Sequence, residues 1–268
     1  MNKLFEEVES LYKSNSTFRN SIEVSIRGQR VILESDSDDT LELPESPKCD
    51  CKTVFSTKRT LQSAKEYIKL GYKVGCLNFA SAKTPGGGCN GNANAQEESL
   101  CRASSLYYCI SDKDCMSKFY LPHRRVSFTT LYNDDCIFTP DVAVIRNDNG
   151  DNSVLREKDW YNISFVTCAA PNVGAYKEKL TEADQYNLVK KRLDRIMRIF
   201  AMNGIRVVVL GAFGCGVFKC NPSIVSRAMK EVIAKYAEYF EVVDIAVPLG
   251  KKGHNEVYDT FKRVFGGR

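Results

Sequence analysis

Residues 73–98 read KVGCLNFASAKTPGGGCNGNANAQEE, an order of residue types that predicts a strand, then a loop, then a helix. The apolar run at 73–79 favours a short strand, glycine and asparagine dominate 80–95, and a helix is expected to begin near Gln96. Residues 205–222 have the same order. An aliphatic run without alternation leads into the loop GAFGCGVFKC, and Asn221-Pro222 then fit the N-cap and first position of a helix.

The rest of the chain continues this alternation. Helical periodicity appears at 59–70, and after Thr181 and Asp184, which fit a capping box. The helix that opens at Pro222 is expected to reach 240. Further strands are expected at 142–146, 163–168 and 242–247. Alternating strands and helices predict an α/β fold, a three-layer α/β/α sandwich around a largely parallel or mixed central sheet.

The first 50 residues differ in pattern from the remainder. Residues 4–13 predict a helix, 22–26 and 30–33 predict a hairpin, and the segments 34–40 and 43–51 are typical of loops. We therefore expect an N-terminal extension (1–50) packed on a core domain (51–268).

Composition excludes several classes of protein. The chain has 268 residues, of which 43% are hydrophobic, so it can form a core and is not disordered. Its longest nearly apolar stretch, 207–218, is too short to cross a bilayer, and its start has no secretory signal. Eleven cysteines at irregular spacing without such a signal are typical of reducing compartments. We expect an intracellular, monomeric protein of the cytoplasm or nucleus, with no membrane partner.

The two histidines limit the possible chemistry. A histidine triad or a histidine-rich metal site would have to use His123 or His254, so carboxylate chemistry without a metal or cofactor is favoured. The eleven cysteines leave two alternatives open. Zinc binding lacks paired C-x-x-C ligands, and a nucleophile at Cys89, Cys101 or Cys215 would need one of those histidines folded against it.

Both glycine-rich loops have a chemical use. In such sheets, ligands bind beyond the carboxyl ends of the strands. Glycine lets the backbone approach an anion with its N–H groups, and a helix N-terminus favours negative charge there. The loop at 211–216 is not a Walker loop, because no Gly-Lys-Ser/Thr follows it. Each loop alone is also compatible with a tight turn, and acidic residues at 97–98 with an ordinary first helical turn.

Together, the two loops resemble those of the microbial-type poly(ADP-ribose) glycohydrolase family, whose signature is GGG, a spacer of six to eight residues, and QEE. Here the spacer is residues 89–95. The resemblance extends through 77–82, 96–107, 139–142, 169–172 and 211–218, and so covers about residues 50–250. It implies a macrodomain-like fold and a catalytic domain at 51–268.

The resemblance also implies roles for individual residues. Glu98 matches the catalytic acid, which protonates the departing ribose oxygen and then activates water, and Glu97 matches the residue that orients the ribose. The glycine triplet and Asn78 match contacts to the distal ribose, residues 211–216 the diphosphate loop, and Phe218 the aromatic residue on the distal ribose. The candidate site residues are Asn78, Gly86, Gly87, Gly88, Gln96, Glu97, Glu98, Gly211, Ala212, Phe213, Gly214, Cys215, Gly216, Val217 and Phe218.

The expected function is therefore hydrolysis of the 1''–2' ribose–ribose bond of poly(ADP-ribose), with ADP-ribose as the product and no cofactor. The net charge of +5 would help to attract such a polyanion. Two alternatives stay open at this point. One is removal of single ADP-ribose units from ADP-ribosylated protein or nucleic acid, and the other is a reader that binds ADP-ribose without turnover.

Overall fold

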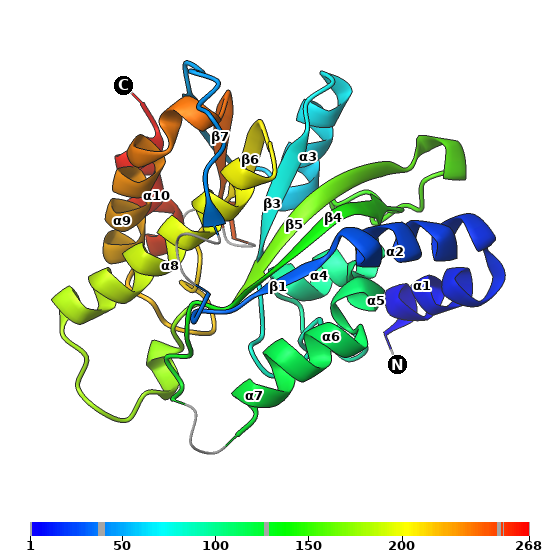
Figure 1. Ribbon diagram of the computed structural model, residues 1–268, viewed down its shortest axis with the longest axis horizontal. Helices are drawn as coiled ribbons and strands as arrows, with labels where there is room; N and C mark the ends of the chain where they lie inside the picture. The colour runs from blue at the N-terminus through cyan, green and yellow to red at the C-terminus, as the bar shows by residue number, and fades with distance from the viewer. Residues whose placement is uncertain (1, 37–40, 126–128, 251–252, 254, 268) are drawn as a thin grey trace.

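The computed structural model describes residues 2–36, 41–125, 129–250, 253 and 255–267 (Figure 1). Its helices are α1 (Lys3–Ser14), α2 (Ser16–Gly28), α3 (Thr60–Lys69), α4 (Gln96–Ala103), α5 (Leu106–Ile110), α6 (Lys113–Cys115), α7 (Leu121–His123), α8 (Glu182–Met202), α9 (Pro222–Lys235) and α10 (Glu256–Phe265). Its strands are β1 (Arg30–Ile32), β2 (Lys52–Ser56), β3 (Val74–Phe79), β4 (Cys136–Val144), β5 (Tyr161–Cys168), β6 (Val207–Leu210) and β7 (Val242–Ala246). His254 and residues 37–40 of a predicted loop lie outside the described residues.

The strands form one mixed sheet in the order β1-β4-β5-β3-β6-β7-β2. The five strands from β5 to β2 in this order are parallel, and β4 is antiparallel to both β1 and β5. Strand β3 pairs with β6, so the two strands that precede the glycine-rich loops lie side by side. Both loops therefore leave the same edge of the sheet.

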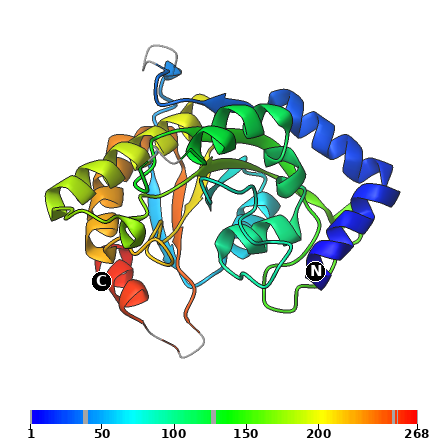
Figure 2. The ribbon, with the colours of Figure 1, turned by 90° about the horizontal axis from the view of Figure 1, so that it is seen from below.

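Helices cover both faces of the sheet and complete the three predicted layers (Figures 1 and 2). Helices α8, α9 and α10 pack on one face, and α1 to α5 contribute to the core on the other. Strand β6 shows why no alternation is visible in its sequence. Val208 and Leu210 enter the first core while Val207 and Val209 enter the second, so every position of β6 is apolar.

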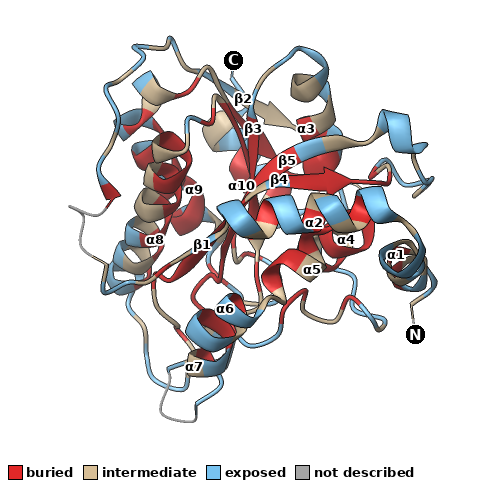
Figure 3. Cartoon of the chain, turned by 45° about the vertical axis from the view of Figure 1, so that its right-hand side comes forward, coloured by how far each residue is buried: buried red, intermediate tan, exposed pale blue. Residues whose placement is uncertain are grey.

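The predicted hairpin in the N-terminal segment is wrong. Residues 22–26 belong to helix α2, and Arg30–Ile32 pairs instead with β4. The buried residues of α2, Phe18, Ile22 and Ser25, are spaced four and three apart, which is the period of a helix lying on the sheet. Figure 3 shows this amphipathic arrangement, with an exposed outer face on α2. The β-branched residues of this segment suggested strands, but packing on the core decides the conformation.

The remaining differences are mostly at the ends of elements. Thr181 and Asn221 are confirmed as N-caps, but the Asp184 carboxylate accepts from the Thr181 hydroxyl rather than from its N–H, so the predicted capping box is only half formed. Helix α9 ends at Lys235 rather than near 240. Strand β4 begins six residues earlier than predicted, and its register shifts between Thr139 and Val142. Strand β2 and helix α10 were not predicted. In the described part of the chain, no helix combines the length and apolarity needed to cross a membrane.

Candidate active site

Glu98 lies in the first turn of α4 and is held by backbone amides at both carboxylate oxygens. Its Oε1 accepts a hydrogen bond from the Gly88 N–H at 3.0 Å, and its Oε2 accepts one from the Ala95 N–H at 3.0 Å. A Cβ at Gly87 would lie 2.4 Å from Glu98 Oε1, and the positive φ of 56° at Gly87 also favours glycine. The glycine triplet therefore wraps closely around this carboxylate.

Glu97 is more deeply buried than Glu98 and contacts different groups. Its Oε2 accepts a hydrogen bond from the Ser81 N–H at 2.7 Å, and its Oε1 accepts one from Asn78 Nδ2 at 3.3 Å. The pKa of Glu97 is raised to about 8, chiefly by burial and to a smaller extent by the nearby Glu98, whereas the hydrogen bonds from Ser81 and Asn78 oppose the shift. Glu97 is therefore a protonated, neutral carboxyl group at pH values below about 8.

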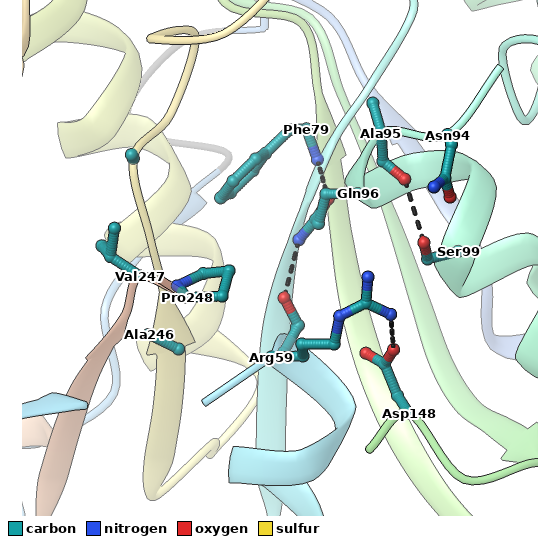
Figure 4. Close-up of a pocket in the computed structure, with 12 residues that line it drawn as sticks. Arg59, Phe79, Asn94, Ala95, Gln96, Ser99, Asp148, Ala246, Val247 and Pro248 are labelled. Carbon is teal, nitrogen blue, oxygen red and sulfur yellow. Dashed lines mark hydrogen bonds and ion pairs between the residues drawn. The ribbon is translucent and has the colours of Figure 1, made fainter. Parts of the chain in front are cut away.

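Asn78 and Gln96 connect the strand β3 to this pair of glutamates. Asn78 is fully buried and also donates to Thr167 Oγ1, so the structure places it behind Glu97. Gln96 accepts from the Phe79 N–H at 2.9 Å (Figure 4). It donates to Leu77 O at 2.8 Å and to Thr60 Oγ1 at 3.1 Å. Gln96 thus fixes the start of α4 against the end of β3.

The second glycine-rich loop leaves β6 beside this region. Phe213, Cys215, Lys219 and Cys220 donate their N–H groups to carbonyls within the loop. Among the described residues, none accepts a hydrogen bond from the N–H groups at 214 and 216–218. Gly214 has a φ of 73°, and Val217 is 77% exposed. The loop therefore presents unused backbone donors, which suit an anion.

Two adjoining cavities lie between the loops. One, of about 350 Å³, is lined by six of the eight predicted residues of the second loop, Ala212, Gly214, Cys215, Gly216, Val217 and Phe218. The other, of about 250 Å³, is lined by Arg59, Asn94, Ser99 and Asp148, among other residues (Figure 4). They share Phe79, Ala95, Gln96, Ala212, Val247 and Pro248. Together they form an elongated cleft suited to a ligand with two ends.

Some predicted residues do not line these two cavities. Gly211 directly follows β6, and a Cβ there would lie 2.7 Å from Ala246 O. Phe213 is fully buried, with its ring 5.8 Å from that of Phe79. Glu97 and Glu98 follow directly after the lining residue Gln96 on α4, and the glycine triplet surrounds Glu98. The two glutamates therefore lie next to the residues that both cavities share, although neither glutamate lines either cavity itself.

Several cleft residues were not predicted from the sequence. Arg59 and Asp148 form an ion pair with N–O 2.7 Å, and Val247-Pro248 follow β7. Arg59 precedes α3, and Val247-Pro248 follow a strand parallel to β6. These positions next to a helix start and a strand end are the sequence signal that could have identified them as cleft residues. Asp148 lies in an irregular segment that is distant in sequence, and nothing local marks it.

Among the described residues, His123 is not placed to act as the base that a cysteine nucleophile would need, and His254 lies outside them. His123 bonds to Phe119 O and to Asn133 Oδ1 rather than to Cys89, Cys101 or Cys215. Burial raises the pKa of the Cys215 thiol, which disfavours a thiolate nucleophile there. Within the described ranges, His, Cys, Asp and Glu side chains do not gather in groups of three or more that could hold a metal ion.

Comparison with known proteins gives a consistent result. The family model "Microbial-type PARG, catalytic domain" matches residues 5–147. The chain is similar to the poly(ADP-ribose) glycohydrolase (PARG) of Thermomonospora curvata, with 28% identity over 98% of both chains and a TM-score of 0.87. The same enzyme bound to the inhibitor ADP-HPD matches with a TM-score of 0.83 and 28% identity over 97% of both chains.

The PARG of a second organism also matches the chain. The PARG of Deinococcus radiodurans in complex with ADP-ribose is 28% identical to the chain over 90% of this chain and 96% of that one, with a TM-score of 0.78. No curated protein sequence matches the chain. The family model covers more than half of the chain. The chain therefore belongs to the family of microbial-type PARG catalytic domains.

Proposed function

We propose that this protein is a poly(ADP-ribose) glycohydrolase that cleaves the 1''–2' ribose–ribose bond and releases ADP-ribose. The observation that carries the proposal is the position of Glu98 beside the cleft, with both carboxylate oxygens held by amides of the glycine-triplet loop. A binding protein needs the unused N–H donors of the second loop, but it does not need a fixed carboxylate. Glycosidic cleavage needs such a group.

The cleft suits ADP-ribose in one orientation. The diphosphate would bind the N–H groups at 214 and 216–218, where no protein acceptor competes among the described residues. Phe218 would pack on the distal ribose, whose reacting carbon then faces Glu98. The cavity beyond Phe79, near Arg59 and Asp148, remains for the adenine end of the ligand.

The two glutamates would have different roles. Glu98, as an acid, would protonate the 2' oxygen of the departing ribose while the bond to C1'' breaks and an oxocarbenium-like centre forms. As a carboxylate it would then take a proton from water, whose oxygen bonds to C1''. Glu97, which is neutral below about pH 8, would orient the ribose hydroxyl groups through hydrogen bonds. Asn78 would act on the ribose through Glu97, the side chain that it contacts.

The decisive experiment is incubation of the wild-type protein and Glu98→Gln with poly(ADP-ribose), followed by quantification of free ADP-ribose. We expect release by the wild type, and a loss of about 100-fold or more in Glu98→Gln, because the amide cannot donate and recover the proton. Glu238→Gln, which changes an exposed glutamate after α9, is the matched control and should behave as wild type. ADP-ribose should bind to all three proteins.

Other outcomes would identify the alternatives. Tight ADP-ribose binding without release by the wild type would indicate a reader. Release only from mono-ADP-ribosylated protein or nucleic acid would indicate a hydrolase of single units. Either result would overturn the proposal.

The proposal includes a monomeric, intracellular protein made of an N-terminal extension (1–50) and a catalytic domain (51–268). All eleven cysteines are free thiols, although Cys136 and Cys168 are cross-strand neighbours, which is typical of a reducing compartment. Light scattering coupled to gel filtration and a thiol titration of the denatured protein would test both points. A dimer, or fewer than the eleven thiols, would contradict them.

A further inference from the structure

Arg102, in the last turn of α4, is a buried arginine that donates hydrogen bonds to the carbonyl groups of one loop. Its Nε donates to Cys89 O at 2.8 Å, and its Nη2 lies 2.6 Å from Ala93 O, 3.0 Å from Gly91 O and 3.4 Å from Gly88 O. The residue is 5% exposed. One guanidinium group therefore contacts four carbonyls within the six residues 88–93.

Arg102 differs from two other buried arginines in the groups that stabilise its charge. The buried arginines Arg146 and Arg192 form ion pairs with Glu7 and Asp134. No carboxylate within the described ranges lies within 4 Å of the Arg102 guanidinium. Burying a charge without an opposite charge is costly, so hydrogen bonds to carbonyls must offset it. The loop is accordingly the main partner of this side chain.

The carbonyls that Arg102 contacts lie between the two amides that hold Glu98. Gly88 donates to Glu98 Oε1 at the start of this segment, and Ala95 donates to Oε2 directly after it. A displacement of the segment would move one or both donors away from the carboxylate. Arg102 itself is one turn of α4 beyond Glu98, so the same helix supplies the acid and the side chain that fixes its loop.

Asn2, the N-cap residue of helix α1, also binds the same loop. The Asn2 N–H donates to Asn90 O at 2.9 Å, and Asn2 Nδ2 donates to Gly91 O at 3.2 Å. Phe5 packs edge-on against Tyr107 with ring centroids 4.9 Å apart. Glu7 of α1 also pairs with Arg146, whose Nε donates to the Arg102 carbonyl. The N-terminal helix is therefore part of the support of this loop.

We propose that Arg102 is a positioning residue for the glycosidic cleavage: by binding the carbonyls of residues 88–93 it fixes the two amides that orient Glu98, with Asn2 as a second, weaker fastening. This inference rests on the proposed function. Arg102 lines neither of the two cavities that form the cleft, although it lines a small neighbouring cavity that shares Asp148 with one of them. Its hydrogen bonds go to residues 88–93 rather than to the diphosphate loop, so we expect it to act on kcat through Glu98.

The test compares Arg102→Lys with Met229→Ala, a buried change in α9 in the other core. Lysine keeps the charge but has a single nitrogen in place of the planar guanidinium, so it cannot reproduce the contacts that Nε and Nη2 of Arg102 make with four carbonyls. We expect kcat for poly(ADP-ribose) to fall by about 10- to 100-fold in Arg102→Lys, because a misplacement of about 1 Å has effects of this size. KM and ADP-ribose affinity should stay within about threefold, and Met229→Ala should keep its kcat in the folded fraction.

Asn2→Asp is a milder variant that does not depend on the stability of Arg102→Lys. Aspartate keeps the acceptor that caps α1 at the Leu4 N–H but removes the donor to Gly91 O. We expect kcat to fall by about two- to fivefold. In both variants, hydrogen exchange should increase in peptides covering 86–95 and stay unchanged in peptides covering 211–220.

Hydrogen exchange also separates this inference from the proposed function. If the wild type released no ADP-ribose while Arg102→Lys loosened 86–95, the proposed function would fail and the fastening of the loop would stand. If Arg102→Lys lost activity only in proportion to its unfolded fraction, as Met229→Ala would, or lost ADP-ribose affinity with kcat intact, the positioning role would be overturned.

Discussion

The two glycine-rich loops leave neighbouring strands at one edge of the sheet, yet their amides hold different groups. In the loop at 80–95, the Gly88 and Ala95 N–H groups donate to the Glu98 carboxylate, and the Ser81 N–H donates to Glu97. In the loop at 211–220, the N–H groups that donate reach only carbonyls of the same loop, and those at 214 and 216–218 have no acceptor among the described residues. A carboxylate that transfers a proton must be fixed, whereas a diphosphate needs donors that the protein leaves free.

The space around the glycines also differs between the two loops. A Cβ at Gly87 would lie 2.4 Å from the Glu98 carboxylate, and one at Gly86 would lie 2.9 Å from Cys89 Sγ. A Cβ at Gly216 would find no heavy atom within 4 Å. The first loop is thus closed around Glu98, whereas the second is open at Gly216, which lines the cleft. Substitutions in the two loops should therefore have different consequences.

The largest effect is expected for Gly87→Ala. Alanine at a φ of 56° is strained, and its Cβ would displace the Glu98 carboxylate. We expect kcat for poly(ADP-ribose) to fall by about 100-fold, with ADP-ribose affinity largely kept. Steady-state kinetics and calorimetric titration would measure the two quantities.

The matched control for this substitution is Gly71→Ala. Gly71 follows α3 with a φ of 86°, and a methyl group added there would have no neighbour within 4 Å, so alanine carries the backbone penalty without the clash. The variant should lose about 1 kcal/mol of stability and keep its kcat. Equal kcat losses in the two variants would mean that the close contact with Glu98 has no catalytic importance.

A smaller effect of another kind is expected for Gly214→Ala in the open loop. Its φ is 73°, and a Cβ would lie 2.6 Å from Ala170 Cβ and 2.7 Å from Cys220 Sγ, so the loop must shift. We expect the ADP-ribose dissociation constant to rise by about tenfold, the cost of roughly one hydrogen bond to a charged group, with a smaller change in kcat. Gly204→Ala, at a φ of 62° and with open space, is the control and should bind normally.

The buried Glu97 makes stability depend on pH. Its pKa is raised from 4.5 to about 8 in the folded protein, so the folded state favours the neutral form, and this stabilisation is lost as pH rises from 4.5 through 8. Glu97→Gln stays neutral at all pH values. Relative to wild type, it should gain up to about 4 kcal/mol in unfolding free energy between pH 5 and pH 9.

Denaturant unfolding of both proteins at the two pH values would measure this difference. Glu231→Gln, at an exposed carboxylate that is paired with Lys190, is the control, and it should show no such gain. A constant difference between wild type and Glu97→Gln across the pH range would contradict the neutral state of Glu97.

The sequence was sufficient for the layers, the parallel centre of the sheet and the position of both loops, because each depends on local periodicity or on glycine spacing. It was not sufficient for α2, whose β-branched residues suggested a hairpin although its buried positions follow a helical period. Nor could it show that Asn2 and Arg102 bind the same loop. Such contacts join residues that are distant in sequence, and they leave no local pattern.

The smallest effect is expected for Gly216→Ala, which tests whether the second loop is open. Gly216 is exposed, and its added methyl group would meet nothing within 4 Å, so unfolding free energy should change by less than about 0.5 kcal/mol. Thermal unfolding without ligand would measure this. A larger loss would mean that the loop is packed as tightly as the one around Glu98.

With the fold unchanged, any fall in ADP-ribose affinity must come from the methyl group meeting the ligand, since Gly216 lines the cleft. Gly87→Ala cannot separate fold from ligand in this way, because its methyl group meets the catalytic carboxylate first.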